Sequence, residues 1–239
     1  MLIFQKGFNY SQDGPGNRLV YHLEGCNMCC IWCSNPEGMK KGKGKELSIN
    51  ELLEEVLRSK MMFFNGGGVT FTGGEPTLQF EELKEILIKL KENNIHTAIE
   101  TNGTSTKLKE LLPYIDYLIM DFKHYDSDIH EKYTGLKNNI IKDNNIIKDN
   151  IKYISTLNYK LHIRIPLING INTQNINEYI KFFKSINTNN IDFEFLAYHE
   201  YGKSKWQEEY LVKDGFITSN TLKNFINEFK ENNLKIVNT

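Results

Sequence analysis

Residues 25–36 read GCNMCCIWCSNP and hold all four cysteines of the 239-residue chain, Cys26, Cys29, Cys30 and Cys33. A disulfide framework would spread its cysteines to join distant loops, whereas clustered cysteines indicate metal binding in a reducing compartment. The spacing Cys26-x3-Cys30-x2-Cys33 lets one short loop place three thiolates on three irons of an iron–sulfur cube, and the fourth iron stays open. We therefore predict one [4Fe–4S] cluster on these three residues, with Cys29 as a bystander.

A structural zinc site built from all four thiols is the alternative interpretation. Zinc knuckles normally draw two Cys-x2-Cys pairs from separated segments. Here all four cysteines fall within eight residues, and the adjacent Cys29 and Cys30 point in different directions. The pattern therefore favours the iron–sulfur cluster over zinc.

The overall composition is that of an ordinary soluble protein. Hydrophobic residues make up 40% and charged residues 25%, and the formal net charge is -1, which gives no indication of a nucleic-acid or membrane partner. The first ten residues contain one lysine and no long apolar segment, so they do not resemble a signal peptide. Apolar runs stay well below the roughly 18 residues of a membrane span. We expect a cytoplasmic protein with one domain, residues 1–239.

Short segments rich in Val, Ile, Phe and Tyr alternate along the chain with segments of helical periodicity. Many of the short segments are apolar at consecutive positions, as expected for parallel strands buried on both faces. Strands are expected at residues 18–23, 68–72, 96–100, 117–121, 160–165 and 192–196. Helices are expected after a capping box of Ser48 and Glu51 and at residues 80–93, 176–186 and 222–229. This alternation predicts an α/β fold, a partial (β/α)6 TIM-like barrel.

The hexapeptide NNIIKD occurs twice in tandem, at residues 138–143 and 144–149. We interpret this duplication as an insertion in a loop or at the start of a helix rather than as a binding element. After Trp206, a flexible stretch followed by a closing helix is expected.

A second motif, Thr72-Gly73-Gly74-Glu75-Pro76, ends the second expected strand. Glycines allow close approach of the backbone, and the Glu75 carboxylate could accept hydrogen bonds from an ammonium group. A Gly-Gly-Glu run by itself is more often a tight turn. Its functional interpretation depends on the cysteine loop that precedes it.

Polar and charged residues also follow the other expected strands. Active sites of α/β barrels gather at these strand ends. Each group has a structural explanation by itself, such as a rim ion pair or a surface histidine, but their joint position at one face predicts a site. The groups are Glu100-Thr101-Asn102-Gly103, Asp121-Phe122-Lys123, Arg164 and Tyr198-His199-Glu200.

The cysteine loop, with an aromatic residue before its last cysteine, resembles that of the radical S-adenosylmethionine (SAM) superfamily. This resemblance implies that the open iron binds the amino and carboxylate groups of SAM. A reduced cluster then passes one electron to the sulfonium, which releases methionine and a 5′-deoxyadenosyl radical that abstracts hydrogen. The cofactor carries this chemistry, and the protein orients it.

Further stretches resemble the glycyl-radical-enzyme activating enzymes, and most of all the pyruvate formate-lyase activating enzymes. The resemblance implies an oxidoreductase that installs a radical on a glycine Cα of a partner glycyl radical enzyme. It also implies an electron donor such as a flavodoxin or ferredoxin, while nothing in the sequence demands more than a monomer. The stretches are DGPGNR at residues 13–18, GGGVT at 66–70, IMDFKH at 119–124 and YHEYGKSKW at 198–206.

The same resemblance assigns roles to individual residues. It assigns catalytic roles to the cluster ligands Cys26, Cys30 and Cys33 and to Lys123, and it places Asp13 on the loop that faces the partner's glycine. A monovalent cation, Na or K, is possible at Glu100 and Asp121, although the family usually has Asp where Glu100 stands. The residues expected to bind SAM are Trp32 and Ser34 at the adenine, Gly73, Gly74 and Glu75 at the amino group, Asp121, Lys123, Arg164 and His199 at the ribose and carboxylate, and also Asn102 and Phe122.

The sequence departs from the family in ways that concern the partner. Residues 37–73 contain no cysteine, so the ferredoxin-like insert of many activating enzymes is missing and one cluster is expected. Residues 34–37, SNPE, are more similar to activators of dehydratase- or decarboxylase-type partners than to the His-Asn of most pyruvate formate-lyase activators. The partner therefore stays open between these types.

Two other functions remain as alternatives. Another small radical SAM enzyme, such as a deazaguanine synthase or the activator of anaerobic ribonucleotide reductase, is disfavoured by residues 198–206. A non-catalytic metal-binding module would tolerate replacement of Glu75, Lys123 or His199, whereas the enzyme interpretation predicts that these replacements abolish SAM turnover.

Overall fold

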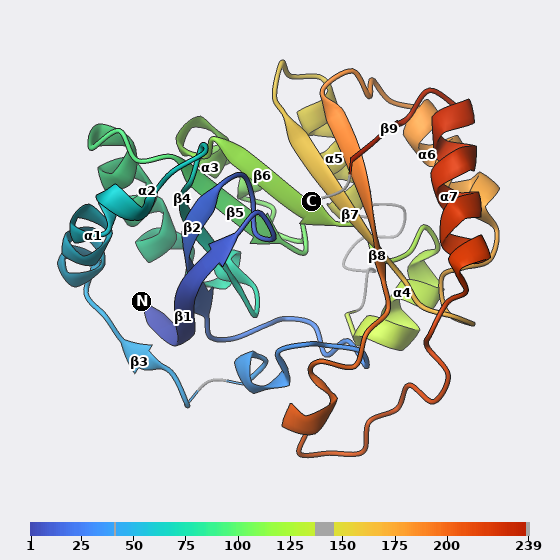
Figure 1. The fold of residues 1–239 in the computed structure, drawn as a ribbon, viewed down its shortest axis with the longest axis horizontal. Coiled ribbons are helices and arrows are strands. Elements are labelled where there is room, and N and C mark those ends of the chain that lie inside the picture. The colour runs from blue at the N-terminus through green and yellow to red at the C-terminus, as the bar shows by residue number, and fades with distance from the viewer. Residues whose placement is uncertain (41, 137–145, 238–239) are drawn as a thin grey trace.

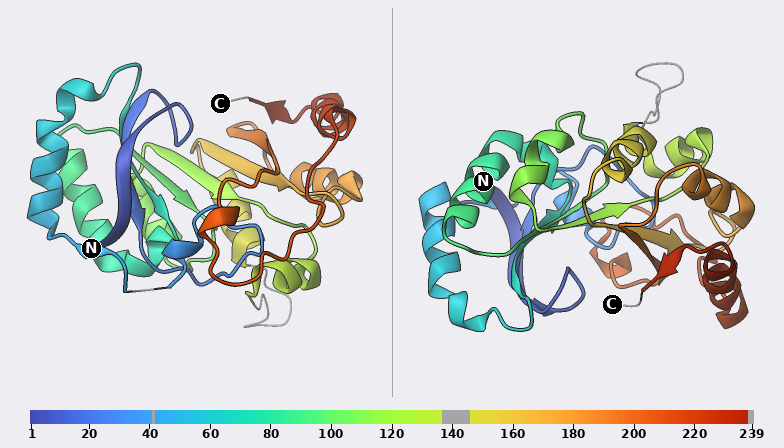
Figure 2. Two further views of the ribbon diagram at one scale, coloured as in Figure 1. Left: turned by 60° about the horizontal axis from the view of Figure 1, so that its bottom comes forward. Right: turned by 90° about the horizontal axis from the view of Figure 1, so that it is seen from above.

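An open, mostly parallel sheet forms the centre of the protein, with helices on its convex side (Figures 1 and 2). The structure is a computed structural model that describes residues 1–40, 42–136 and 146–237. In this part of the chain the strands are β1 (Leu2–Tyr10), β2 (Asn17–Leu23), β3 (Lys45–Glu46), β4 (Gly68–Gly73), β5 (Thr97–Thr101), β6 (Tyr117–Asp121), β7 (Leu161–Leu167), β8 (Ile191–Ala197) and β9 (Lys235–Ile236).

The strand order is β3-β1-β2-β4-β5-β6-β7-β8-β9. Neighbours from β2 to β9 are parallel, whereas β1 runs antiparallel to both β2 and β3. The sheet does not close between its two edges, so the predicted partial barrel is confirmed. Consecutive parallel strands with helical crossovers bring all their carboxyl ends to one edge, which is where a site can form.

The expected strands are β2 and β4 to β8, and their bounds differ from the expectation by at most two residues. The sequence did not predict β1, β3 or β9. Strands β3 and β9 have two residues each, too few to show an alternation. Strand β1 has four consecutive exposed residues in its middle, so it lacks the buried pattern used to recognise strands.

The α-helices of the described residues are α1 (Ile49–Arg58), α2 (Phe80–Glu92), α3 (Leu108–Leu111), α4 (Ser127–Thr134), α5 (Ile146–Ser155), α6 (Ile176–Lys184) and α7 (Ser219–Glu231). The predicted capping box starts α1: Glu51 N–H donates to Ser48 Oγ at 3.2 Å, and Ser48 N–H donates to Glu51 Oε2 at 2.7 Å. Helices α2, α6 and α7 match the expected segments, and α7 is the closing helix. None of these helices combines the length and apolar composition needed to cross a membrane.

Helices α3, α4 and α5 were not predicted, because α3 is one turn long and α4 is mostly polar. Helix α5 begins at Ile146, inside the second copy of the NNIIKD repeat. The first copy, residues 138–143, lies outside the described residues. The second copy therefore contributes to the start of a helix.

Aromatic packing fixes α6 and α7 against the sheet. The ring centroids of Phe183 on α6 and Phe193 on β8 are 4.6 Å apart, and those of Phe193 and Phe229 on α7 are 5.4 Å apart. Phe122, directly after β6, stacks on Phe182 at 5.3 Å and is 1% exposed. Pairs of this kind stabilise a core beyond their buried area. They anchor the strands whose opposite face carries the polar residues of the site.

Arg18 ties the loop between β1 and β2 to the sheet. Its side chain is fully buried and donates to Thr70 Oγ1 at 2.7 Å, to the Val69 carbonyl at 2.6 Å and to the Pro15 carbonyl at 3.0 Å. Thr70 Oγ1 in turn donates to the Asp13 carbonyl at 2.7 Å. Burial lowers the pKa of Arg18 to about 10, so it remains charged at neutral pH. The loop is thus held inside the open barrel.

Replacing Arg18 by Lys should lower the free energy of unfolding by about 3 kcal/mol. A single ammonium cannot reach acceptors on two segments, and the buried carbonyls would lose their donors. Urea unfolding measures this change. As a control, Arg58→Lys on α1, where the arginine side chain is 73% exposed, should stay within about 0.5 kcal/mol of the parent. Equal effects of the two replacements would contradict this role of Arg18.

Candidate active site

A cavity of about 610 Å³ lies at the carboxyl ends of the parallel strands. A smaller cavity of about 190 Å³ shares part of its wall. The wall of the larger cavity comes from the loop between β1 and β2, from the ends of β2 and β4 to β8, and from the loops that follow β2 and β8. Its residues are Gln12, Asp13, His22, Cys26, Met28, Cys30, Cys33, Ser34, Asn35, Thr72, Gly73, Gly74, Glu100, Thr101, Asn102, Asp121, Lys123, Arg164, Glu194, Leu196, His199, Tyr201 and Lys205.

The carboxyl end of α4 supports the cysteine loop, residues 25–36, from one side. Cys29 N–H donates to the Thr134 carbonyl at 2.8 Å, and Ile31 N–H donates to the Tyr133 carbonyl at 3.1 Å. The last carbonyls of a helix have no donors within the helix. The cysteine loop supplies those donors, and the helix end therefore fixes its path.

The segment after β8 holds the same loop from another side. Trp206 Nε1 donates to the Cys33 carbonyl at 3.1 Å. Gly202 lies so close to the loop that a Cβ atom there would be 2.5 Å from Ser34 Cα and 2.7 Å from the Cys33 oxygen. A larger residue at 202 would push the loop away. The segment 198–206 therefore packs against the cysteine loop and helps to fix its position.

Cys26, Cys30 and Cys33 all face the larger cavity. Met28 N–H donates to Cys26 Sγ and Asn35 N–H donates to Cys33 Sγ, each at 3.4 Å. Burial raises the pKa of all three thiols, that of Cys26 to about 11. A metal centre replaces the protons of such thiols and stabilises the buried thiolates. Three thiols around one cavity, two of them with backbone donors, fit a three-cysteine iron–sulfur cluster.

Cys29 points away from the other three cysteines. It is exposed and does not line either cavity. A Cβ atom built on Gly135, the residue that ends α4, would lie 2.1 Å from Cys29 Sγ. Within the described ranges, no three His, Cys, Asp or Glu side chains converge on a position for a single metal ion. This placement disfavours a zinc ion bound by all four thiols.

The Gly-Gly-Glu motif packs directly on the start of the cysteine loop. Gly74 N–H donates to the Leu23 carbonyl at 2.9 Å, and Glu75 N–H donates to the Gly25 carbonyl at 2.8 Å. A Cβ atom on Gly74 would lie 2.2 Å from the Gly25 oxygen, and Gly73 has a φ of +119°. Both positions therefore require glycine. The two motifs form one unit, and both glycines line the cavity.

The Glu75 carboxylate does not line this cavity, and its contact with the SAM amino group stays a prediction. It is fully buried and accepts hydrogen bonds from Thr77 N–H at 3.0 Å, Thr101 Oγ1 at 2.7 Å and Asn102 N–H at 2.7 Å. Burial raises the pKa of this carboxyl, while these donors favour the charged form. Glu75 thus joins the end of β4 to the end of β5 and acts on the cavity through its neighbours.

Asn102 links the end of β5 to the cysteine loop. Its Nδ2 donates to Asn27 Oδ1 at 2.9 Å, and Asn27 Nδ2 donates to Thr104 Oγ1 at 2.8 Å. Asn102 also lines the cavity, whereas Phe122 does not. Phe122 was expected at SAM, but its ring faces α6 on the outer side of the sheet.

Two ion pairs lie at the carboxyl ends of β5, β6 and β7. Arg164 Nη1 donates to Glu100 Oε1 at 2.9 Å, and Thr72 Oγ1 donates to Glu100 Oε2 at 3.1 Å. Lys123 pairs with Asp121. Burial alone would lower the pKa of Lys123, but the nearby Asp121 and the cysteines raise it above its usual value. These two pairs thus place two largely buried cations on the cavity wall, and both acidic residues proposed for a monovalent cation are already paired.

The smaller cavity has a more apolar wall. Trp32 lines it, Ser34 and His199 line both cavities, and Tyr201 N–H donates to His199 Nδ1 at 3.4 Å. Burial lowers the pKa of His199, so the ring is neutral and its other nitrogen is the donor. A planar aromatic group with polar edges fits such a wall. The other apolar residues there are Pro166, Ile168, Leu196, Ala197 and Tyr198.

The structure adds residues that the sequence did not indicate, among them Gln12, His22, Glu194 and Tyr201. His22 and Glu194 each stand between apolar residues of a strand, and this contrast is a signal that the sequence does contain. Gln12 reaches the cavity because Arg164 binds its carbonyl oxygen. Burial lowers the pKa of His22, so it is neutral at neutral pH.

Comparison with known proteins gives consistent results. The model of the radical SAM superfamily matches residues 20–183. Pyruvate formate-lyase-activating enzyme of Staphylococcus aureus strain USA300 is 34% identical over 207 residues, which cover 82% of this chain and 80% of that protein. The chain therefore belongs to the radical SAM superfamily, and within it to the family of pyruvate formate-lyase-activating enzymes. It is a radical SAM activating enzyme, and this family implies a [4Fe–4S] cluster and SAM.

Solved structures support the same fold. A domain of pyruvate-formate lyase-activating enzyme from Bacteroides vulgatus ATCC 8482 has 27% identity and a TM-score of 0.59, covering 72% of this chain and 98% of that one. A radical SAM methyltransferase from Sphaerobacter thermophilus has 14% identity and a TM-score of 0.70, covering 97% and 72%. The second likeness concerns the fold alone. These findings confirm the predicted family and the partial barrel.

Replacement of Cys26, Cys30 or Cys33 by Ser should abolish cluster assembly, because each thiol faces the same cavity. Cys29→Ser is the matched control and should retain the iron and sulfide content of the parent, because Cys29 points elsewhere. Iron and sulfide analysis after anaerobic reconstitution measures both. Loss of iron in Cys29→Ser, with iron retained in any of the other three variants, would contradict this assignment.

Proposed function

We propose that this enzyme installs a stable radical on a glycine Cα of a partner glycyl radical enzyme. The observation that carries the proposal is the position of Cys26, Cys30 and Cys33 around one cavity that Lys123 and Arg164 also line. Relatives named for the activation of pyruvate formate-lyase support the choice of reaction. The free thiols suit the reducing cytoplasm, and a monomer is part of the proposal.

When bound, the [4Fe–4S] cluster and SAM supply one-electron cleavage of SAM, so that one electron, SAM and the glycine C–H give methionine, 5′-deoxyadenosine and a glycyl radical. Cys26, Cys30 and Cys33 would hold the cluster, and a flavodoxin or ferredoxin would deliver the electron. The protein must then bind SAM, orient it and exclude water from the reacting atoms.

We assign the polar groups to SAM by charge and position. The ammonium of Lys123 and the guanidinium of Arg164 suit the carboxylate of SAM, because hydrogen bonds between ionised groups are the strong ones. The backbone at Gly73 and Gly74 suits its amino group, with Glu75 and Asn102 holding that backbone in place. The smaller cavity suits the adenine, with Trp32, Ser34 and His199 on its wall.

A monovalent cation at Glu100 and Asp121 also remains part of the proposal. Both carboxylates lie at the cavity, but Arg164 and Lys123 already neutralise them. A sodium or potassium ion would have to compete with these pairs. SAM binding is therefore measured in a buffer in which choline replaces both sodium and potassium. A loss of affinity in this buffer would show that SAM binding depends on these ions.

The partner is proposed to be pyruvate formate-lyase or a dehydratase- or decarboxylase-type glycyl radical enzyme. Asp13 lies on the loop between β1 and β2 and lines the same cavity as the cysteines, which suits contact with an inserted glycine. Residues 34–37 favour the dehydratase or decarboxylase type.

Electron paramagnetic resonance tests the proposal directly. Reduced enzyme, SAM and one partner of each type are mixed anaerobically, and the expected result is a glycyl radical doublet with at least one of them. The doublet should be absent without SAM and absent when the partner's glycine is replaced by alanine. Failure of every partner to give a doublet, with SAM cleavage intact, would overturn the proposed activity.

Lys123→Met should lower the rate of SAM cleavage roughly 100-fold, because it removes a buried cation next to the reacting groups. The iron content should stay at the parent level, since Lys123 is not a cluster ligand. Lys181→Met on α6, where the lysine side chain is 77% exposed, is the control and should cleave SAM at the parent rate. Formation of 5′-deoxyadenosine measured by chromatography decides the outcome. Cleavage at equal rates in all three proteins would contradict the role of Lys123, and no cleavage by the parent would favour a non-catalytic metal-binding module.

A further inference from the structure

A continuous line of buried charged groups runs from the cavity along the inner faces of β7 and β8. Arg164 Nη1 donates to Glu100 at 2.9 Å, and Arg164 Nε donates to Glu194 Oε2 at 2.9 Å. The same Glu194 oxygen lies 3.1 Å from His162 Nε2, and His162 Nδ1 lies 2.6 Å from Asp192 Oδ1. The parallel register pairs His162 with Asp192 and Arg164 with Glu194, so the line follows from strand alignment.

His162 lies at the centre of this line, and its side chain has no exposed surface. Each ring nitrogen faces a carboxylate oxygen, and an ionised carboxylate only accepts hydrogen bonds. Both nitrogens must therefore carry hydrogen, which makes the ring an imidazolium. The other groups that face it are the Tyr117 ring, at 5.9 Å between centroids, and Arg164 on its own strand.

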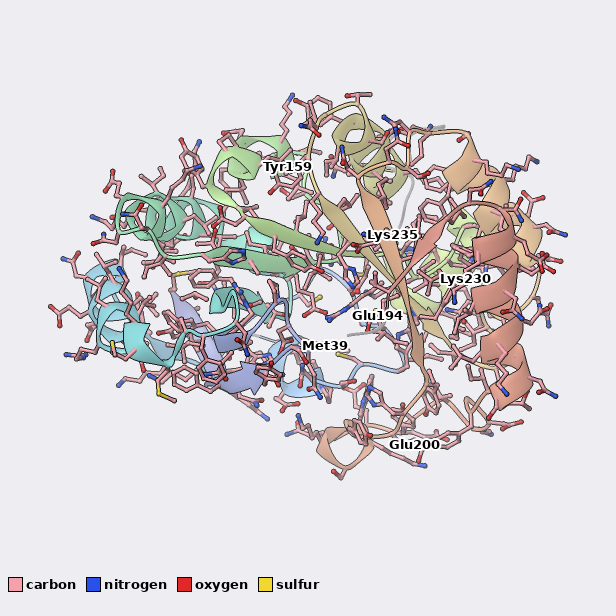
Figure 3. The ribbon with its side chains drawn as sticks, turned by 45° about the horizontal axis from the view of Figure 1, so that its top comes forward. Met39, Tyr159, Glu194, Glu200, Lys230 and Lys235 are labelled. Carbon is pink, nitrogen blue, oxygen red and sulfur yellow. The ribbon has the colours of Figure 1, made fainter. Side chains whose placement is uncertain are left out.

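The far end of the line is Asp192. Lys160 Nζ and Lys235 Nζ lie 4.0 Å and 3.7 Å from Asp192 Oδ2, and both lysine side chains are more than half exposed. Figure 3 shows Lys235 on β9 and Glu194 near the middle of the molecule. Exposed lysines are screened by water and salt, so they hold the carboxylate weakly. The buried positive charge against Asp192 comes from His162.

We propose that protonated His162 is a positioning residue for Arg164, acting through the shared oxygen of Glu194. This inference rests on the proposed function, in which Arg164 binds the carboxylate of SAM. Without the imidazolium, Glu194 would lose the cation on the side of its Oε2 away from Arg164, and the position of this oxygen would be held less tightly. The hydrogen bond between Arg164 Nε and Glu194 would then be weaker. The guanidinium of Arg164 would therefore be less precisely oriented toward the cavity.

The charge on His162 makes this positioning depend on pH. Burial alone would lower the pKa of His162, but its hydrogen bonds with Asp192 and Glu194 outweigh burial and raise the pKa above its usual value of about 6.5. The imidazolium correspondingly lowers the pKa of Asp192. Positioning is therefore strongest below pH 6.5, and it is lost as the pH rises through the raised pKa of His162.

Equilibrium binding of SAM to the anaerobically reconstituted enzyme, measured by calorimetry between pH 6 and 9, tests the proposal. His162→Gln should weaken binding roughly 10-fold at pH 6.5, and the difference from the parent should shrink as the pH rises. The amino group of SAM titrates equally in both proteins, so the difference isolates His162. His96→Gln is the control: His96 contacts Arg18 at the other end of the sheet, and SAM affinity should not change.

Asp192→Asn provides a variant that leaves His162 in place. It should lower the pKa of His162 and move the alkaline loss of SAM affinity to lower pH, and it should have no further effect when combined with His162→Gln. A readout without cofactors comes from nitrogen-15 NMR of the histidine rings in the protein before reconstitution. Both ring nitrogens of His162 should be protonated at pH 6.5.

The outcomes separate this inference from the proposed function. If the parent binds SAM, and His162→Gln binds it with the same affinity and pH profile, the positioning role is wrong and the proposed function stands. A His162 ring that titrates at or below pH 6.5 would also overturn the role. If the parent does not bind SAM at any pH, the proposed function itself fails.

Discussion

The backbone contact between two glycine turns determines the rest of the site. Parallel pairing of β2 with β4 brings Gly25 against Gly74, and hydrogen bonds from the Gly-Gly-Glu turn fix the cysteine loop at its start. Neither glycine tolerates a side chain, because each backbone fills the space that a Cβ atom would need or adopts a left-handed φ. From this point the cysteine loop extends over the cavity, and α4 and Trp206 only need to hold its far part.

The interior of the open barrel carries charge where a sealed barrel would carry apolar side chains. Strands β7 and β8 have apolar residues toward the helices, but toward the interior they place His162, Arg164, Asp192 and Glu194. Burial of such ions costs free energy unless each is paired. Here each residue pairs with the next one along the row: Asp192 with His162, His162 with Glu194, and Glu194 with Arg164. This row of paired ions ends at the cavity, where it fixes the orientation of the Arg164 guanidinium. An apolar core would not hold a cation in one orientation.

The sequence was sufficient for the features that follow from local chemistry. Cysteine spacing, apolar runs and the Ser48 capping box are local, and the corresponding loop, parallel strands and helix were predicted. Side-chain direction at a turn is not local, so the sequence did not indicate that the Glu75 carboxylate joins the ends of β4 and β5. For the same reason Phe122 was expected at SAM, since a one-residue shift past a strand end changes the face that a side chain occupies. The roles of His162 and Glu194 depend on strand register, which the sequence leaves open.

The central claim is that three cysteines hold a cluster with an open iron that binds SAM. Electron paramagnetic resonance of the reconstituted, dithionite-reduced protein, recorded with and without SAM, tests it most directly. The account predicts a reduced [4Fe–4S] signal whose g-values change when SAM is added. Bound zinc with no such signal, or a cluster signal that SAM leaves unchanged, would contradict it.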